Sequence, residues 1–482
     1  MENVATLTEN ALTLTQEVDN LFQLQKKHAQ TLKNTTARER IATLNRFKDY
    51  MMSHLEELHE AMYKDFKKSP TEINLSEVFP ILASIKHINA KLHRWMRPKS
   101  ASTPMNMLGT SSQVLPEPKG VCLIIAPWNY PYNLTFDPLM YAIAAGNTAI
   151  LKPSEMTPHT SAFIKKTVQA VFKPEEVFVF EGDAQVATEL LKKPFDHIFF
   201  TGSPMLGKIV MKAAAEHLTS VTLELGGKSP VVIDETSNIK DAAQKITYGK
   251  FLNCGQTCIA PDYLLVHEKV KDELINEIKS NIKKYYSGEK GDLSVEQTPD
   301  YTRIVNQRHF GRVKNLLEDA LSKGAKVVAG GETNANDNFI APTLITDVND
   351  DMNVMKEEIF GPLLPIKTFN HLQEATDYIK TKEKPLALYI FSKDKSKRDF
   401  VMQNTTAGGT SINDTLLHIA NPDLPFGGVN NSGIGKTHGY FGFQAFSNER
   451  AVLKQRIGLT SVKFLYPPYT PQVKKMLKFF MK

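Results

Sequence analysis

The segment HIFFTGSPMLGKIVMKAAAEHLTSVTLEL, residues 197–225, indicates the fold. It predicts a short apolar strand over 197–201, a helix over 204–218 and a second strand over 221–225. Strands joined by a helical crossover lie parallel, with helices covering the faces of the sheet. The segment is therefore one repeating unit of an α/β domain.

The same alternation continues on both sides of this segment. Strands recur about every 25 residues, which is typical of a doubly wound, dinucleotide-type domain. Further strands are expected over 121–125, 148–151 and 177–180, with helices over 158–172 and 184–193. After a boundary near Gly227, a second α/β series is expected, with strands over 230–233, 263–266, 326–328, 386–391 and 409–412 and a helix over 312–322. Ahead of both, apolar residues at spacings of three and four predict one helix over 36–67.

Composition excludes several classes of protein. The chain has 482 residues, 41% hydrophobic and 23% charged, as in globular proteins with large cores. The net charge of +6 is small for this length, and the basic residues form no long block. A nucleic-acid partner is therefore not expected.

The cysteines and the N-terminus indicate a cytoplasmic protein. Cys122, Cys254 and Cys258 are too few for a disulfide framework and leave at least one free thiol, as in a reducing compartment. The first residues carry acids and hydroxyls where a signal peptide needs a basic start and an apolar run. No stretch approaches the ~18–20 apolar residues of a membrane-spanning helix.

The first candidate site is FLNCGQTCIAPD, residues 251–262. Cys258 follows Gly255, where the sequence ends a helix and exposes backbone amides that stabilise a thiolate or an oxyanion. Alternatively, Cys258 is a buried small apolar residue, or Cys254, one helical turn earlier, is the nucleophile. No cluster of His or Cys lies nearby, so no metal site is expected.

The second candidate is Glu224, in VTLELGGKSP at 221–230. A carboxylate at a strand end among apolar neighbours has a raised pKa and suits a general base. Because Leu223 and Leu225 flank it, the alternative is a surface acid on an edge strand that faces solvent.

Three turns complete the candidate sites. APWNYP at 126–131 follows a strand, and Asn129 there can donate an N–H to an oxyanion, or simply belong to a turn bounded by prolines. LKPSE at 151–155 offers Lys152 and Glu155 to a ribose, or is the ordinary start of a helix.

FFTGSPMLG at 199–207 places Gly202 and Ser203 before a helix that starts at Pro204, a geometry suited to phosphate. It is not G-x-G-x-x-G, and a plain strand-to-helix connection is the alternative.

Taken together and in order, these motifs resemble the aldehyde dehydrogenase superfamily over nearly the whole chain. The matching segments are PWNYP (127–131), KPSE (152–155), FTGS (200–203), LELGGKSP (223–230), GQTC (255–258), EEIFGP (357–362) and LPFGGVNNSGIGKTHG (424–439). The chain looks most like the class 3 group of fatty, aromatic and coniferyl-type aldehyde dehydrogenases. PWNYP, GQTCIAPDY, the short N-terminus and FLYPPYT (464–470) carry that finer resemblance.

The resemblance implies the roles of the site residues. Cys258 attacks the aldehyde carbon, and its own N–H and the Asn129 amide hold the oxyanion. After hydride transfer to the cofactor, Glu224 activates the water that hydrolyses the thioester. Cys254 is expected to be a bystander, because neighbours one helical turn apart rarely meet disulfide geometry, although a protective disulfide with Cys258 is the alternative.

The resemblance also implies NAD, with NADP possible, since Glu155 would repel a 2′-phosphate. Implied cofactor residues are Lys152 and Glu155 at the adenosine ribose, Gly202 and Ser203 at the pyrophosphate, Glu358 and Phe360 at the nicotinamide, and Trp128 and Gly226 in the same site. Thr201-Gly202-Ser203-Pro204 departs from the family's Gly-x-Thr form of the phosphate turn.

The implied fold is that of aldehyde dehydrogenases, arranged as a homodimer. We expect an NAD(P)-binding domain over 1–103 and 121–227 and an α/β catalytic domain over 228–423. A bridging segment for oligomerisation is expected over 104–120 and 440–463, followed by a tail over 464–482.

Two other functions are compatible with the same motifs. A CoA-acylating dehydrogenase would pass the acyl group to CoA, but such relatives tend to lack the general base, and Glu224 favours hydrolysis. A catalytically silent relative with a binding role would have lost Cys258, Asn129 or Glu224, and all three are present.

The C-terminal tail predicts a short basic amphipathic helix. Its apolar residues are Val473, Met476, Leu477 and Phe480, and its lysines are Lys474, Lys475, Lys478 and Lys482. This helix would pack on the protein itself, cover the substrate entrance as a lid, or contact an anionic membrane face. The protein would then be cytoplasmic but able to associate with membranes.

Overall fold

The computed structural model describes residues 2–104, 107, 109–458, 460 and 462–481, without the side chains of residues 2–13, 464 and 480. The segment 197–225 folds as predicted, into β6 (His197–Gly202), α9 (Pro204–Ala215) and β7 (Ser220–Leu225). β6 and β7 are parallel, with Thr201 opposite Glu224.

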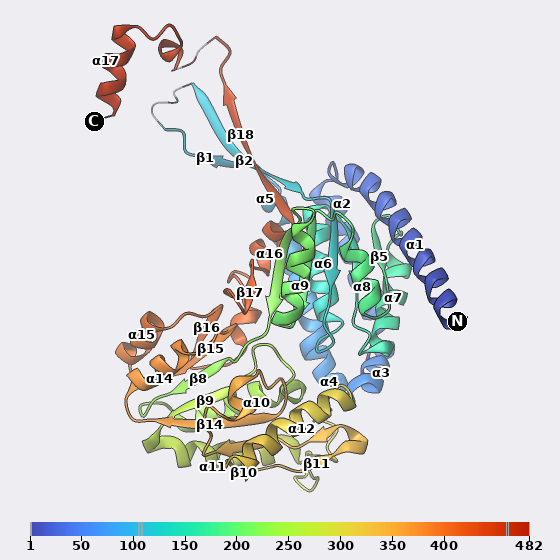
Figure 1. Cartoon of the computed structure of the whole chain (residues 1–482), viewed down its shortest axis with the longest axis vertical. Helices are drawn as coiled ribbons and strands as arrows, with labels where there is room; N and C mark the ends of the chain where they lie inside the picture. The colour runs from blue at the N-terminus through green and yellow to red at the C-terminus, as the bar shows by residue number, and fades with distance from the viewer. Residues whose placement is uncertain (1, 105–106, 108, 459, 461, 482) are drawn as a thin grey trace.

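These strands belong to a sheet covered by helices on both faces (Figure 1). In β3, Cys122 and Ile124 contact one core, and Val121, Leu123 and Ile125 contact another, as the two-residue period of a strand requires. The strand order is β17 (Gly433–Ile434), β7, β6, β3 (Val121–Ile125), β4 (Thr148–Lys152) and β5 (Val177–Val179). One face carries α2 (Ala37–Ser53), α3 (Leu55–Phe66), α5 (Phe79–Trp95), α6 (Asn133–Ala145) and α7 (Pro158–Val171). The other face carries α1 (Glu2–Leu32), α8 (Ala184–Leu191) and α9. The predicted doubly wound domain is thus confirmed.

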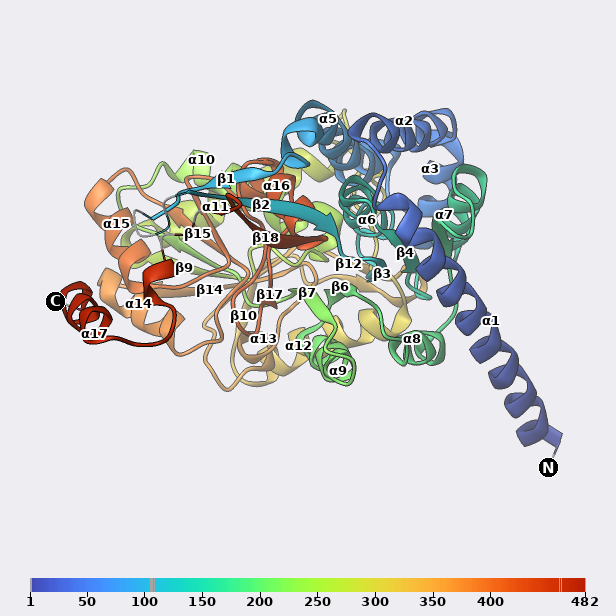
Figure 2. The ribbon, with the colours of Figure 1, turned by 90° about the horizontal axis from the view of Figure 1, so that it is seen from above.

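The single helix expected over 36–67 is wrong. The structure has α2 (Ala37–Ser53) and α3 (Leu55–Phe66), separated at His54, where φ is −126° and ψ is 26°. The apolar spacing hid the break, because both helices bury their apolar faces in the same core. The helix α1 (Glu2–Leu32) was not predicted; it runs along the outside of the first sheet, beside β4 and α8 (Figure 2).

A second sheet supports the turn that carries Cys258. Its strand order is β10 (Lys326–Ala329), β13 (Thr343–Thr346), β14 (Leu363–Phe369), β9 (Tyr263–His267), β8 (Pro230–Ile233), β15 (Ala387–Phe391) and β16 (Gly409–Ile412). Helices α10 (Ile239–Phe251), α11 (Lys271–Tyr286), α12 (Gln307–Ser322), α14 (Leu372–Lys380) and α15 (Lys395–Asn404) accompany it. β13 and β14 were not predicted, and Pro365 inside β14 weakens its strand pattern. α12 starts earlier than expected because Asn306 caps it by accepting from His309 N.

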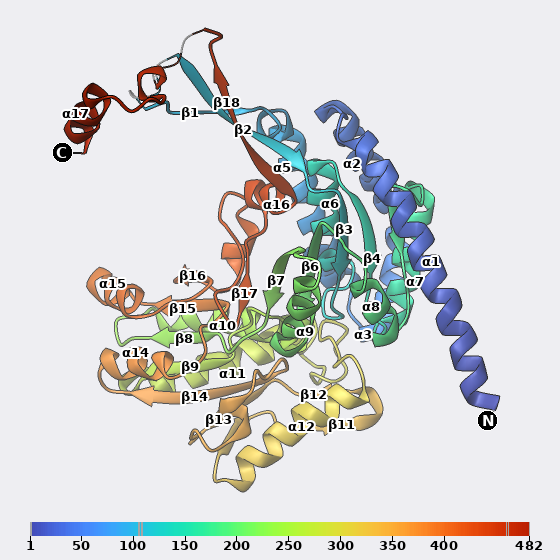
Figure 3. The ribbon, with the colours of Figure 1, turned by 45° about the horizontal axis from the view of Figure 1, so that its top comes forward.

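A small antiparallel sheet projects from the body (Figures 1 and 3). It joins β1 (Lys99–Ala101), β2 (Thr110–Pro118) and β18 (Ser447–Gln455), with Ser447 opposite Pro118 and Gln455 opposite Thr110. Residues 105, 106, 108, 459 and 461 of the expected bridging segment lie outside the described residues. The division of the chain into domains stays a prediction.

The tail ends in α17 (Pro471–Phe480), beyond the small sheet (Figure 1). The predicted helix therefore forms, with Thr470 as its cap. Val473 is buried and Leu477 is exposed, whereas the Phe480 side chain and Lys482 lie outside the described residues. Among the described helices, none is both long and apolar enough to cross a membrane.

Candidate active site

The turn after α10 determines where Cys258 lies. Asn253 and Cys254 both have left-handed backbone, with φ of 53° and 54°, and Gly255 follows with φ of 73°. A Cβ at Gly255 would lie 2.3 Å from the carbonyl oxygen of Gly361, so only glycine fits there. The expectation that Cys254 lies one helical turn before Cys258 is therefore wrong, because the helix ends at Phe251.

The two cysteines have different environments. Both are free thiols. Cys254 is fully buried, and its Sγ donates to Tyr301 Oη across 3.4 Å. Cys258 is partly buried in the turn that follows. Of the two thiols, it is that of Cys258 on which the charges of the candidate residues Glu224 and Glu358 act.

The loop after β3 is hydrogen-bonded to this turn. Asn129 Nδ2 donates to Gln256 O across 3.0 Å, and Asn253 Nδ2 donates to Asn129 O across 2.8 Å. Tyr130 Oη and Thr257 Oγ1 share a hydrogen bond of 2.6 Å. Asn129 and Cys258, 129 residues apart in sequence, are thereby brought to one place.

A buried polar network that the sequence analysis missed lies behind Asn129. Lys68 and Glu77 form an ion pair of 3.0 Å with neither side chain exposed, and Lys68 Nζ also donates to Asn129 O across 3.5 Å. Glu72 accepts from Asn253 N across 2.8 Å and from Thr302 Oγ1 across 2.9 Å. Its sequence signal is KSPTEINLSEV at 68–78, where charged residues interrupt an apolar helical pattern.

Glu224 is buried at the end of β7, with 6% of its surface exposed. The alternative of a solvent-facing acid on an edge strand is wrong, because β17 pairs with β7 and places Gly433 opposite Glu224. Among the described residues, neither carboxylate oxygen of Glu224 has a hydrogen-bond partner. Burial raises the pKa of Glu224 well above its ordinary value, and the Lys436 ammonium partly opposes this. The raised pKa expected from the sequence is present.

The Cys258 thiol lies close to two carboxyl groups. Burial raises its pKa to about 12, and the negative charges of Glu358 and Glu224 contribute. The backbone N–H groups of Cys258 and Ile259 act in the opposite direction and lower the pKa of this thiol. A sulfur, two carboxyl groups and two backbone donors therefore share one site.

Glu358, Phe360, Trp128 and Gly226 gather on one side of this site. A Cβ at Gly226 would lie 2.1 Å from Glu358 Oε2, so the carboxyl group fits only against glycine. The rings of Trp128 and Phe360 meet edge-on with centroids 5.2 Å apart. Burial and the neighbouring Asp262 raise the pKa of Glu358 to about 8.

Lys152, Glu155, Gly202 and Ser203 form a second group. Lys152 and Gly202 end β4 and β6, and Glu155 and Ser203 follow these parallel strands, whose carboxyl ends lie at the same edge of the sheet. Lys152 Nζ lies 2.9 Å from Glu155 Oε2, and α7 begins only at Pro158, so the alternative that 153–155 starts a helix is wrong. Ser203 caps α9 by accepting from Leu206 N across 3.4 Å.

These two groups fit a nucleotide cofactor with ribose hydroxyls. Among the described residues, Glu358 Oε1 is buried without a hydrogen-bond partner, in the space that the absent Gly226 side chain leaves open. Such an acceptor suits a hydroxyl donor. The start of α9 next to Ser203 suits a phosphate.

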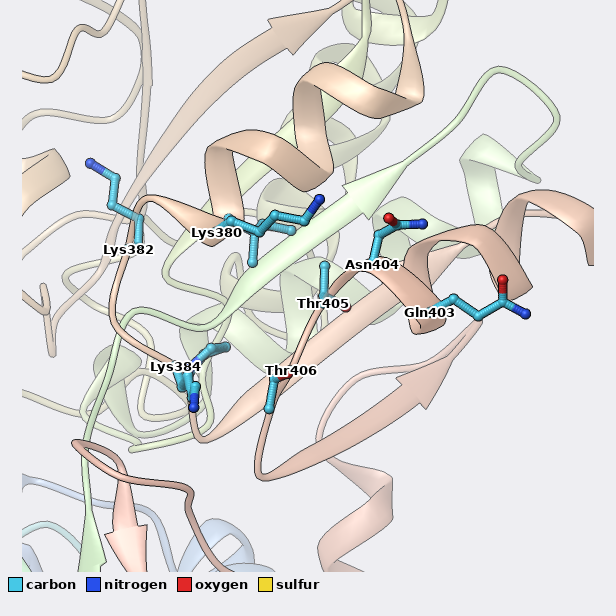
Figure 4. Close-up of a pocket in the computed structure, with 9 residues that line it drawn as sticks. Lys380, Lys382, Lys384, Gln403, Asn404, Thr405 and Thr406 are labelled. Carbon is cyan, nitrogen blue, oxygen red and sulfur yellow. The ribbon is translucent and has the colours of Figure 1, made fainter.

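A separate cavity of about 350 Å³ lies between the ends of α14 and α15 (Figure 4). Lys380, Lys382 and Lys384 are among its lining residues. Lys380 pairs with Asp377, Lys382 with Asp350, and Lys384 donates to Asn430 Oδ1 across 2.7 Å. None of the predicted site residues lines it, so it is distinct from the candidate active site.

The family model described as aldehyde dehydrogenase family matches residues 3–452. The chain belongs to the aldehyde dehydrogenase family. This aldehyde dehydrogenase is similar to the putative aldehyde dehydrogenase AldX of Bacillus subtilis, with 46% identity covering 91% of this chain and 98% of that one. A probable coniferyl aldehyde dehydrogenase of Caulobacter vibrioides is 41% identical, covering 94% and 95%. Aldehyde dehydrogenase family 3 member A2 of Rattus norvegicus is 42% identical, covering 92% and 90%, which confirms the class 3 resemblance.

Solved structures confirm the fold of this aldehyde dehydrogenase. The substrate-bound AldH of Staphylococcus aureus has a TM-score of 0.91 and 42% identity, covering 96% of this chain and 99% of that one. PnpE in complex with nicotinamide adenine dinucleotide has a TM-score of 0.83 and 26% identity, covering 92% and 91%. The enzyme is an oxidoreductase that oxidises an aldehyde to the acid with NAD or NADP.

Proposed function

We propose that Cys258 is the nucleophile and Glu224 the general base of this aldehyde oxidation. The observation that carries the proposal is the meeting of Cys258, Glu224 and the Asn129–Gln256 hydrogen bond in one buried site. Cys258 is the cysteine with the neighbouring carboxylates and backbone donors. Cys254 is fully buried and already bonded to Tyr301, so it is a bystander.

In the first half of the reaction, the Cys258 thiol loses its proton to solvent water and its Sγ bonds to the aldehyde carbon. The carbonyl oxygen becomes an oxyanion held by the Cys258 N–H and by the free N–H of the Asn129 amide, whose other N–H donates to Gln256. NAD, when held here, would supply the acceptor for the hydride that leaves the same carbon, and Cys258 would then carry a thioester.

In the second half, Glu224 takes a proton from water as the water oxygen attacks the thioester carbon. The C–S bond then breaks, the carboxylic acid leaves, and the proton on Glu224 passes to the sulfur, which restores the Cys258 thiol and the Glu224 carboxylate. A buried carboxylate whose pKa is raised above its ordinary value suits this proton transfer, since it binds a proton more strongly than an exposed carboxylate does. Its presence also favours water over CoA as the acyl acceptor.

The proposed cofactor residues form the two groups described above. Lys152 and Glu155 hold the adenosine ribose, and Gly202 and Ser203 lie at the pyrophosphate. Glu358, Phe360, Trp128 and Gly226 hold the nicotinamide end. The Glu155 carboxylate would repel a 2′-phosphate, so NAD is preferred over NADP.

The proposed substrate is a medium or long aliphatic aldehyde or an aromatic aldehyde. A relative named for coniferyl aldehyde and a family 3 relative are both more than 40% identical to this chain. We infer a cytoplasmic enzyme, consistent with the free thiols of all three cysteines.

We further propose a homodimer built on two sheet edges. Among the described residues, β18 ends the small sheet and β16 ends the second sheet. Both carry exposed apolar side chains, with Leu453 51% and Ile412 47% exposed. Pairing of β18 of one protomer with β16 of its partner would cover both edges. Sedimentation at micromolar concentration tests this, and a monomer would refute it.

The decisive experiment follows absorbance at 340 nm with NAD or NADP and aldehydes from acetaldehyde to hexadecanal, together with benzaldehyde. C258A and C254A are measured beside the unmodified enzyme. Cofactor reduction that disappears only in C258A supports the proposal. Loss in C254A with retention in C258A would reverse the assignment, and no reduction with any aldehyde would point to a CoA-dependent or silent relative.

A further inference from the structure

Lys436 lies beside the proposed general base, and the mechanism above gives it no role. A Cβ at Gly427 would lie 2.9 Å from Glu224 Oε1 and 3.2 Å from Lys436 Cδ. The two side chains therefore meet in the space that the missing side chain of Gly427 leaves open. Gly427 has φ of 143°, so this space is kept by a residue whose backbone favours glycine.

Main-chain carbonyls fix the ammonium group in this position. Lys436 Nζ donates to Gly427 O and to Gly428 O, the latter across 3.2 Å. Lys436 is only partly exposed, and β17, which pairs with β7 next to Glu224, precedes it by two residues. The positive charge is therefore held near the carboxylate by backbone contacts, and no carboxylate in the described part of the chain forms an ion pair with it.

The surroundings of Glu224 contain few other charges. From the adjacent β6 the residue opposite Glu224 is Thr201, and from β17 it is Gly433, neither of which is charged. The turn after α10 brings the Cys258 thiol, and beyond it Glu358, which can only add negative charge. Among the described residues, Lys436 is the positive group whose charge acts on the Glu224 carboxylate.

We propose that Lys436 is a positioning residue for the general base, holding Glu224 in its ionised form and keeping its carboxylate at the end of β7. The inference rests on the proposed role of Glu224. An ammonium group near a buried carboxylate favours the charged form, which is the form that accepts a proton from water. Loss of the ammonium leaves only burial, which favours the protonated and inactive form.

The test compares K436Q and K436M with K436R and K384Q in the full-length enzyme with NAD and saturating aldehyde, from pH 5.5 to 9.5. K384Q is the matched control, because Lys384 also contacts the segment 424–439 that contains Lys436, at Asn430, and lines the separate cavity. Both kcat and the rate of thioester hydrolysis after the first turnover are measured. Melting temperatures verify that each variant is folded.

Removing the ammonium raises the pKa of Glu224, so the acid limb of both profiles should move to higher pH. A shift of about one pH unit gives about a tenfold loss of hydrolysis on the acid side and recovery at high pH. K436R and K384Q should match the unmodified enzyme, and the first-turnover burst should be retained throughout.

A K436Q profile that coincides with the unmodified enzyme would overturn the inference. So would a loss of equal size at every pH, since that indicates a structural role only. Failure of the unmodified enzyme to oxidise any aldehyde would instead refute the proposed function, before any Lys436 variant is compared.

Discussion

The Asn129 side-chain amide donates to the Gln256 carbonyl oxygen across 3.0 Å. This bond joins the loop after β3 of the first sheet to the turn that carries Cys258 beside the second sheet. The bond therefore fixes the distance between the two sides of the site, which a ligand held between the two sheets would contact.

Replacing Asn129 by Ala should lower kcat about 100- to 1000-fold, because one oxyanion donor is lost. KM for the aldehyde should change much less, since the oxyanion exists only after attack. N89A is the control, as Asn89 makes a similar amide bond to Asn45 on distant helices. Steady-state kinetics measure both, and a kcat within twofold of the unmodified enzyme would exclude Asn129 from the oxyanion site.

E224Q should separate the two halves of the reaction. Without a carboxylate to activate water, turnover should fall about 100-fold or more. A first burst of reduced cofactor should remain at high pH, where the thiol loses its proton to water. Stopped-flow absorbance at 340 nm measures both phases. E235Q is the control, because Glu235 pairs with Lys397 away from the site, and it should behave as the unmodified enzyme. If E224Q loses the burst and the turnover to the same extent, the role of Glu224 is not confined to hydrolysis.

The reactivity of Cys258 should depend on the charge of Glu358. The pKa of Glu358 is about 8, so this carboxyl is negative above that pH and raises the pKa of the thiol there. E358Q should therefore speed alkylation by iodoacetamide at pH 9, by about threefold or more, and leave it unchanged at pH 6. The rate is followed by mass spectrometry of the Cys258 peptide. If E358Q and the unmodified enzyme are alkylated at the same rate at pH 9 as well as at pH 6, the charge of Glu358 does not affect the sulfur.

The buried pair of Lys68 and Glu77 should matter for stability. K68M leaves Glu77 buried without its ion-pair partner and should cost about 3–5 kcal/mol of unfolding free energy. The double variant K68M/E77L should recover part of this loss. K64M, on the exposed pair with Glu60, should leave the denaturation midpoint unchanged. Chemical denaturation measures each, and a stable K68M would mean that Glu77 takes up a proton when unpaired.

Deleting residues 471–482 should change the preference among aldehyde chain lengths. α17 lies beyond the small sheet, and its Leu477 side chain is exposed. In this position the helix would serve as a lid over a partner's substrate entrance or would contact an anionic membrane. The ratio of kcat/KM for hexadecanal to that for hexanal should fall in the truncated enzyme. If the truncated and full-length enzymes have the same kcat/KM for every aldehyde from short to long, the helix only packs on its own protein. Flotation with anionic vesicles, beside the truncated form, tests the membrane contact.

The sequence by itself determined the alternation of strands and helices and the chemistry-bearing residues. Short apolar runs separated by helical spacing fix a parallel sheet, because strands buried on both faces tolerate few polar residues. Cys258, Glu224 and Asn129 follow or end such elements, and the sequence pattern indicated each as a candidate site residue.

Tertiary structure decided what pattern alone left open. The alternation of Leu223, Glu224 and Leu225 is compatible with an exposed edge, and only the pairing of β17 with β7 buries Glu224. Likewise, the spacing of Cys254 and Cys258 suggests one helix, and only the left-handed turn at Asn253 and Cys254 separates the two thiols. The contact of Lys68 with Asn129 and the approach of Lys436 to Glu224 join segments that are distant in sequence, which local periodicity does not record.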